Sequence, residues 1–234
     1  MNVKKKLNIL LFFVLPVLAV KAQVCAEMMD FYKSNKELEY VSYDKKDKTS
    51  TSVKYKTLRT EVKNDTSIVW MSFTTYDNKN NEISQNEMPI KCYKDMLIFD
   101  MRSVMPAMPA GGPNAQQDIR MEIKGDDMTF PSEAKVGQTL PDAEMELTTY
   151  MGTMRLLSNK YAIRNRKVEG NERVTTPAGT FDCTKYSYDF EYNFLGKRTS
   201  RTEYWFKPGI GMIKTVNYDK KGGVESRTEL AKIK

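Results

Sequence analysis

The chain has 234 residues, a formal net charge of +7 at pH 7 and no histidine. The missing imidazole excludes His-based acid–base catalysis, Ser-His-Asp and Cys-His nucleophile pairs, and nearly all zinc sites. Four of the positive charges are lysines within the first 22 residues, which contain no acid, so residues 23–234 carry +3. This modest charge does not indicate a nucleic-acid partner.

The N-terminus has the parts of a secretory signal peptide. Three lysines at positions 4–6 precede the apolar run Leu7–Val20, and a cut after Ala22 fits the residues that a signal peptidase recognises. The run is shorter than the roughly 20 residues of a membrane span, which disfavours the alternative of an uncleaved anchor. Val24 precedes Cys25, where a lipoprotein signal has a small residue. We therefore expect a periplasmic or secreted protein without a lipid anchor.

From Leu38 onward the sequence alternates between polar and apolar residues, which predicts strands. Residues 25–35 allow at most a short helix. Turn residues separate the predicted strands, which are Leu38–Tyr43, Val53–Val62, Ser67–Tyr76, Glu82–Tyr93, Met96–Met101, Ile119–Ile123, Met128–Pro131, Met145–Met154, Tyr161–Val168, Phe181–Phe194, Thr199–Lys207, Gly211–Tyr218 and Val224–Ile233.

A short phrase of the type Tyr-Asp-Lys-Lys ends three of these strands, at residues 43–46, 76–79 and 218–221. An aspartate at the first position of a turn can bond its own backbone, so the phrase predicts hairpin turns. A calcium loop is the alternative, but Lys79 occupies a ligand position and no bidentate glutamate follows at the required distance.

Residues 101–117 interrupt the β pattern with three prolines and two glycines, which predicts a long loop or a boundary. Met101, Met105 and Met108 lie in or beside this loop, and clustered thioethers can bind Cu(I). Because no His or Cys lies near them in sequence, packing of a loop is the favoured interpretation. We predict no metal site and no cofactor.

Asp142, Glu144 and Glu146 place carboxylates at strand alternation. Such a pair of acids could act in glycoside hydrolysis. A solvated strand face explains the same pattern, and no second carboxylate motif accompanies it. We therefore predict no catalytic residues.

The most regular stretch lies between Thr180 and Phe194, where aromatic and polar residues alternate. This period of two predicts a strand with one packed face. The face is either the core side of the last sheet, which is favoured, or the wall of a groove for a lipid, peptide or glycan. Its residues are Tyr186, Tyr188, Phe190, Tyr192 and Phe194.

The cysteines are Cys25, Cys92 and Cys183. Disulfides persist in exported proteins, and three cysteines allow one bridge in three ways. The alternative is that all three are reduced packing residues. The sequence does not choose among these pairings.

Together the elements predict a mainly β fold, in which antiparallel hairpins and meanders form a β-sandwich or a partly open barrel with few short helices. We expect residues 1–22 to be the signal peptide and 23–234 a single all-β domain. Two β subdomains joined near 102–117 are the alternative.

Four phrases resemble signatures of the TapB-like family of exported Gram-negative envelope proteins. They are Lys135–Asp142, Asn165–Gly170, Val174–Cys183 and Tyr204–Lys214, and the resemblance spans Cys25–Lys234. It implies an all-β periplasmic or secreted protein of uncharacterised activity and supplies no catalytic residues.

Three functional hypotheses follow. The favoured one is a non-enzymatic binding or carrier module of the envelope, whose aromatic sheet face takes an apolar ligand or peptide. The second is a structural or assembly factor of an envelope complex, and the third is a hydrolase that uses the three carboxylates. The expected partner is a lipid, a peptide or another envelope protein, and not a nucleic acid.

Overall fold

The computed structural model describes residues 36–94, 96–100, 119–131, 133–193 and 196–234. Every regular element in these ranges is a β-strand, and no helix occurs in them. The short helix expected over residues 25–35 lies outside the described residues. The strands are β1 (Glu37–Asp44), β2 (Thr49–Lys63), β3 (Thr66–Asp77), β4 (Glu82–Tyr93), β5 (Met96–Asp100), β6 (Ile119–Gly125), β7 (Asp127–Pro131), β8 (Ala143–Met151), β9 (Met154–Thr176), β10 (Gly179–Asn193), β11 (Lys197–Lys207), β12 (Gly211–Tyr218) and β13 (Val224–Ile233).

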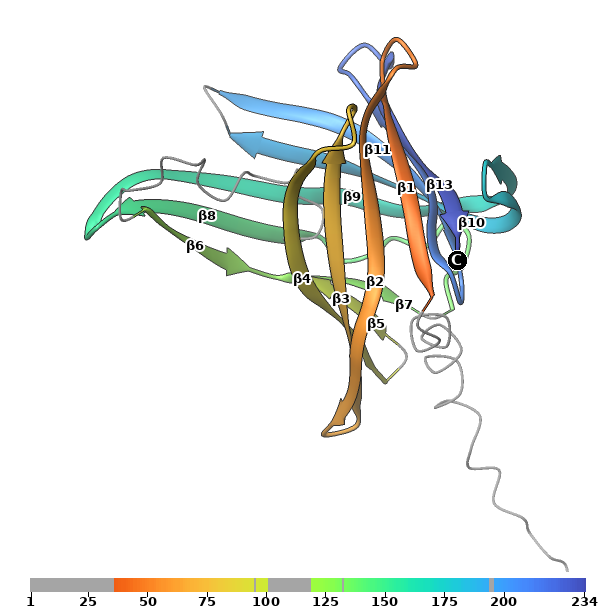
Figure 1. Cartoon of the computed structure of the whole chain (residues 1–234), viewed down its shortest axis with the longest axis horizontal. Coiled ribbons are helices and arrows are strands. Elements are labelled where there is room, and N and C mark those ends of the chain that lie inside the picture. The colour runs from red at the N-terminus through yellow and green to blue at the C-terminus, as the bar shows by residue number, and fades with distance from the viewer. Residues whose placement is uncertain (1–35, 95, 101–118, 132, 194–195) are drawn as a thin grey trace, which may run out of the picture.

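The described strands form one antiparallel sheet in the order β6-β8-β9-β10-β11-β12-β13-β1-β2-β3-β4-β5-β7. It consists of two meanders, β1 to β5 and β8 to β13, which the pairing of β1 with β13 joins (Figure 1). The strands on either side of residues 101–118 therefore belong to the same sheet. The expected mainly β, antiparallel fold is confirmed.

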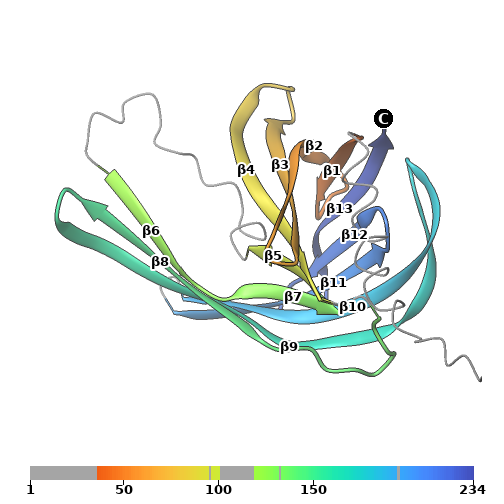
Figure 2. The ribbon, with the colours of Figure 1, turned by 90° about the horizontal axis from the view of Figure 1, so that it is seen from below.

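β6 and β7 bring the two ends of this sheet together. They stand at opposite ends of the strand order, yet only Asp126 separates them in the chain. β6 pairs with β8, whereas β7 pairs with β5. The sheet must therefore curl until its ends meet at Asp126, which gives the partly open barrel and not the sandwich (Figure 2).

Gly125 permits this change of partner between β6 and β7. A Cβ atom at this position would lie 2.2 Å from the carbonyl oxygen of Glu144. The Asp126 N–H donates to the same oxygen over 2.8 Å, and the Glu144 N–H donates to the Asp126 carboxylate over 3.2 Å. Because the two backbones touch here, glycine is the residue that fits.

Two clusters of buried side chains fill the barrel. The larger lies between the β3–β5 and β8–β11 parts of the sheet and includes Val69 and Ile163. The other lies where β1 meets β11 to β13 and includes Leu38 and Ile213. Each of these four side chains is almost completely buried. Burying one such side chain stabilises the fold by roughly 1.5–3 kcal/mol, so the inner face of the sheet provides the main driving force.

The expected strand Met145–Met154 is wrong at its C-terminal end. β8 ends at Met151, residues 152 and 153 form a turn, and β9 begins at Met154. Gly152 has a φ of +57°, a left-handed conformation that suits glycine in a tight hairpin. β9 then continues for 23 residues, where the sequence predicted only Tyr161–Val168.

The outer parts of β8 and β9 project from the barrel together with β6 (Figures 1 and 2). We call this projection the wing; it consists of β6, Leu147–Met151 of β8 and Met154–Lys160 of β9. Its strands are paired along their length, Ile119 with Met151 at one end of β6 and Gly125 with Met145 at the other. β6 is one of the two end strands of the sheet in the described structure, and β7 is the other.

The Tyr-Asp phrases form hairpin turns, as predicted. In the first, the Asp44 carboxylate accepts the backbone N–H groups of Lys46 and Lys48 over 2.8 and 3.0 Å. The turns at Asp77 and Asp219 repeat this geometry. Hydrogen bonds from the backbone of Lys48 and Lys46 lower the pKa of Asp44, because they stabilise the charged carboxylate.

Candidate functional site

The inner end of the predicted aromatic strand, which is β10, lies in the barrel core. Tyr186 is 4% exposed and stacks on Tyr204 of β11, with 4.9 Å between the ring centroids. Tyr188 packs against the same cluster, and its ring lies 5.8 Å from that of Tyr204. Burial raises the pKa of Tyr186 to about 12, and it raises the pKa of Tyr204 well above its ordinary value.

The outer end of β10 leads toward the wing. Phe190 stacks on Tyr161 of β9 at a centroid distance of 6.1 Å, and Tyr192 contacts Phe190 at 5.8 Å. All three side chains are partly exposed. Phe194 lies outside the described residues. The predicted face is therefore divided between the core and a partly open surface.

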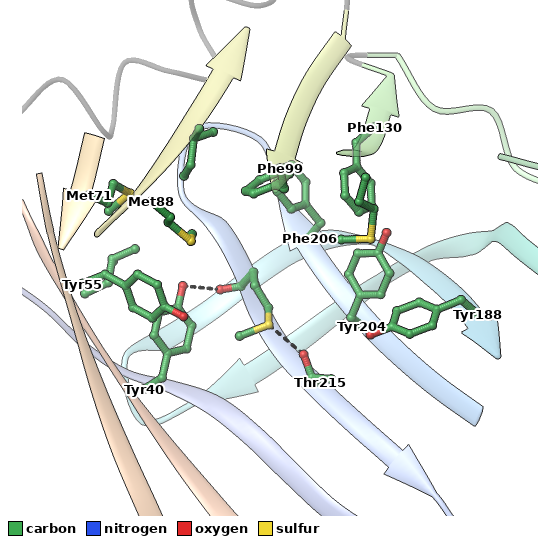
Figure 3. Close-up of a pocket in the computed structure, with 14 residues that line it drawn as sticks. Tyr40, Tyr55, Met71, Met88, Phe99, Phe130, Tyr188, Tyr204, Phe206 and Thr215 are labelled. Atoms are coloured by element: carbon green, nitrogen blue, oxygen red, sulfur yellow. Dashed lines mark hydrogen bonds between the residues drawn. The ribbon is translucent and has the colours of Figure 1, made fainter. Parts of the chain in front are cut away.

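A cavity of ≈160 Å³ lies inside the barrel, between the rings of β10 and β11 and the strands β1 to β5 (Figure 3). From the predicted aromatic face, Tyr188 contributes to the lining of this cavity. The other walls come from eight strands, and no charged side chain is among them. They are formed by Leu38, Tyr40, Tyr55, Met71, Met88, Ile90, Phe99, Met128, Phe130, Tyr204, Phe206, Met212 and Thr215.

Two of the hydroxyl groups at the cavity wall bond to the protein itself. The Tyr40 hydroxyl donates to the carbonyl oxygen of Met212 over 2.8 Å. The Thr215 hydroxyl donates to the Met212 sulfur over 2.7 Å (Figure 3). Since these donors already have partners, the wall presents mainly hydrocarbon, aromatic rings and thioethers to an occupant. Such a surface suits an apolar group.

Arg166 of β9 closes the barrel wall beside this cavity. The side chain is 2% exposed, and its guanidinium donates to the carbonyl oxygens of Thr129 in β7 and of Pro141, each over 2.7 Å. It also lies over the Phe130 ring, 4.8 Å from the centroid, and hydrogen-bonds to the Tyr204 side chain. Burial lowers the pKa of Arg166. Because β7 does not pair with β8 or β9, these bonds link the two ends of the sheet.

Sequence reasoning missed Arg166, although its position carries one signal. Arg166 and Val168 are two residues apart in β9, and both are buried. A charged residue two positions from a buried apolar residue in a strand lies on the same face, so its side chain points inward. The signal is weak, because Asn165, with φ of +53°, interrupts the regular alternation just before it.

The three predicted carboxylates lie outside the cavity. Asp142 and Glu144 both accept hydrogen bonds from Arg164. Glu146 accepts from Ser158, which lowers its pKa, and forms an ion pair with Arg155 at 3.3 Å.

Glu144 and Glu146 line an open hollow of ≈510 Å³, to which Tyr192 also contributes. Lys160 and Arg164 lie in the same hollow, so its charges are mixed.

The cysteines differ in state. Cys92 is disulfide-bonded, whereas Cys183 is a free, buried thiol, and Cys25 lies outside the described residues. Burial raises the pKa of Cys183 to about 11. At neutral pH the thiol is therefore protonated and weakly nucleophilic.

The predicted signal peptide and the Met-Pro-Gly loop also lie outside the described residues. Within the described ranges, no helix is long and apolar enough to cross a membrane. In the same ranges, no three or more Cys, Asp or Glu side chains gather closely enough to hold a metal ion.

Comparison with known protein families identifies the family to which the chain belongs. The family model described as DUF3108-like matches residues 33–230. The chain belongs to the DUF3108-like family. The match covers nearly all the described strands, as the resemblance noted above did, and the TapB-like name stays a prediction. A search of curated proteins finds no match to this DUF3108-like chain.

Two solved structures are similar to it. One, from Bacteroides fragilis, is described as an exported protein with a YmcC-like fold; it is 21% identical, with a TM-score of 0.69. The other, from Parabacteroides distasonis, is described as a lipoprotein; it is 20% identical, with a TM-score of 0.71. Each match covers 86% of this chain and 95% of the neighbour. At this identity the likeness shows the YmcC-like fold. The second neighbour gives no support to the expectation that Cys25 carries no lipid.

Proposed function

We propose that this chain is a non-enzymatic binding or carrier protein of the cell envelope, which holds an apolar group in the barrel cavity. The observation that carries the proposal is the lining of the cavity, which apart from Thr215 consists of aromatic, aliphatic and thioether side chains and includes no charge. The predicted signal peptide supports a place in the envelope. Two neighbours of the same fold, described as an exported protein and a lipoprotein, support it further.

The size of the cavity limits what it holds. Its ≈160 Å³ is close to the roughly 150 Å³ of an engineered apolar cavity that stays dry and binds benzene. A whole lipid does not fit, whereas the end of a hydrocarbon chain or one apolar side chain of a peptide does. The ligand is therefore anchored by one apolar end, and the remainder lies outside the barrel.

Toluene is a suitable probe because it is apolar and close to benzene in size. A ligand that binds only the folded state raises the unfolding temperature as its concentration rises. We expect toluene to stabilise the chain, and Met88→Trp to abolish this effect because the larger ring fills the cavity from β4. Met154→Trp makes the same change on the exposed β8–β9 hairpin and should leave the toluene effect intact.

A second variant keeps the test decisive if Met88→Trp fails to fold. Ile90→Ala enlarges the cavity from the same strand, so it should increase the shift that toluene produces. Native mass spectrometry of the gently purified chain should also show a bound apolar molecule, and Met88→Trp should lose it. No toluene effect in the wild type, or an equal effect in Met88→Trp, would contradict the proposal.

A further inference from the structure

The tip of the wing exposes a group of large apolar side chains. Met154, Leu156 and Leu157 are 55%, 47% and 49% exposed, and Met151 lies beside them on β8 with similar exposure. They cluster at one hairpin that projects from the barrel (Figure 1). A group of exposed apolar residues at a projecting point marks an interaction surface more often than a single exposed residue does.

The apolar tip continues the inner face of the sheet. Met145 and Leu147 of β8 are buried on that face, and Met151 follows them at the same alternation. Across the pair, Leu157 stands opposite Thr149, and Met154 stands opposite Met151. Residues directly opposite on neighbouring strands share a face. A mainly apolar face, interrupted by Thr149 and Asn159, therefore runs from the barrel core to the exposed tip.

Leu156 is exposed because of a bulge. The register between β8 and β9 shifts beside Thr149 and Tyr150, which leaves Leu156 without an opposite residue. A bulge turns the side chain at that point and increases the local twist. Leu156 and Leu157 are both half-exposed as a result, although neighbours in a regular strand point to opposite faces.

Basic residues outnumber acidic ones in the wing. Its three segments contain four basic residues and one acidic residue, Glu122, which forms an ion pair with Lys124. Arg155 lies within the apolar group itself, and Lys160 is exposed a few residues further along β9. The nearest acid along the chain is Glu146, at the base of the wing, and it is paired with Arg155. An apolar tip with cationic flanks matches a surface of anionic lipid headgroups over hydrocarbon.

Another projecting hairpin lacks this combination of an apolar group and excess positive charge. The β2–β3 hairpin carries Val62, which is 77% exposed, but around it Glu61 and Asp65 balance Arg59 and Lys63. A hairpin end without net positive charge is not attracted to anionic lipids, so this hairpin serves as the internal control.

We propose that the tip of the wing, formed by Met151, Met154, Leu156 and Leu157 with Arg155, docks onto the surface of an anionic phospholipid bilayer. The four apolar side chains enter the interface, and the basic residues lie at the level of the headgroups. This inference does not depend on the cavity, and the two can fail separately.

Vesicle flotation of the exported, purified full chain tests the proposal. We expect the chain to float with vesicles of phosphatidylglycerol and phosphatidylcholine in equal parts, and more weakly with phosphatidylcholine alone or at high salt. The double substitution Leu156→Ser and Leu157→Ser should lower the partition coefficient at least about tenfold, since each leucine loses apolar burial. Val62→Ser should leave binding unchanged.

A second measurement reports on the tip alone, whatever the N-terminal segment contributes. Leu157→Trp should show a blue-shifted emission and quenching by brominated lipids when anionic vesicles are added, and Val62→Trp should show neither. Absence of both signals at Leu157→Trp, or wild-type flotation of the double variant, overturns the proposal. So does sedimentation showing that the double variant converts a dimer to a monomer without change in vesicle binding, because the tip is then a contact between two copies.

Discussion

The barrel and the wing are built from the same strands, but only the barrel covers their inner face. In β8, Met145 is buried in the barrel, whereas Met151 at the end of the wing is exposed. In β9, Ile163 is fully buried, whereas Leu157 is half-exposed. The side chains compared in each strand are all apolar. What changes is the opposite side, because among the described strands the β1–β5 part of the sheet lies across from the inner ends of β8 and β9 and not from their outer ends (Figure 2). Alternation places a residue on a face, and the opposing strands decide whether that face is buried.

The largest effect is expected from removing Arg166, which links the barrel ends. Arg166→Met removes the donor to the carbonyl oxygens of Thr129 and Pro141, and a polar group left unsatisfied in the interior costs about 1–3 kcal/mol. We expect a loss of about 3 kcal/mol in the free energy of unfolding, measured by urea denaturation. Arg155→Met removes an exposed ion pair on the wing and should cost less than about 1 kcal/mol. Equal losses would remove the distinction between the two regions.

A somewhat smaller effect is expected at the point where the wing joins the barrel. Gly125→Ala places a Cβ atom against the backbone of Glu144, and this overpacking should cost about 2–3 kcal/mol. Gly170→Ala in β9 meets no atom within 4 Å and should change stability by less than about 1 kcal/mol. Urea denaturation of the two variants measures the difference. A Gly125→Ala chain as stable as Gly170→Ala would show that the change of strand partner tolerates a side chain.

The smallest expected effect is a dependence of the free energy of unfolding on pH, caused by a buried tyrosine of the barrel core. Burial raises the pKa of Tyr186 to about 12, above the value of about 10 for an unfolded tyrosine. The folded state therefore favours the neutral phenol, and the stability that this group contributes is complete below pH 10 and is lost as the pH rises toward 12. By pH 11 the loss should be about 1.4 kcal/mol.

Tyr186→Phe provides the control, because it removes the ionisable group and keeps the ring. The free energy of unfolding of this variant should fall less between pH 9 and pH 11 than that of the wild type, by about 1.4 kcal/mol. The absorbance of tyrosinate, followed in the same samples, reports the ionisation directly. Parallel pH profiles for wild type and variant would contradict the buried environment of Tyr186.

Much of the fold could be predicted because β structure follows a local pattern. Alternation identified the strands, and Asp-initiated turns such as the one at Asp44 identified hairpins, since both depend on neighbours in sequence. The hairpin at Gly152 was missed because Met151 and Met154 continue the apolar pattern across it. The cavity could not be predicted, since its walls come from strands far apart in the chain, as Leu38 and Thr215 illustrate.

The sequence alone determined that the chain is β throughout its described length, that its hairpins turn at the Tyr-Asp phrases, and that imidazole chemistry is absent. Each of these depends on which residues are present or on the spacing of near neighbours. Only the tertiary structure decided that β6 and β7 join the ends of the sheet, that Arg166 points inward beside Phe130, and which rings of β10 are buried. These depend on contacts between distant strands, and no local pattern records which strands will lie opposite one another.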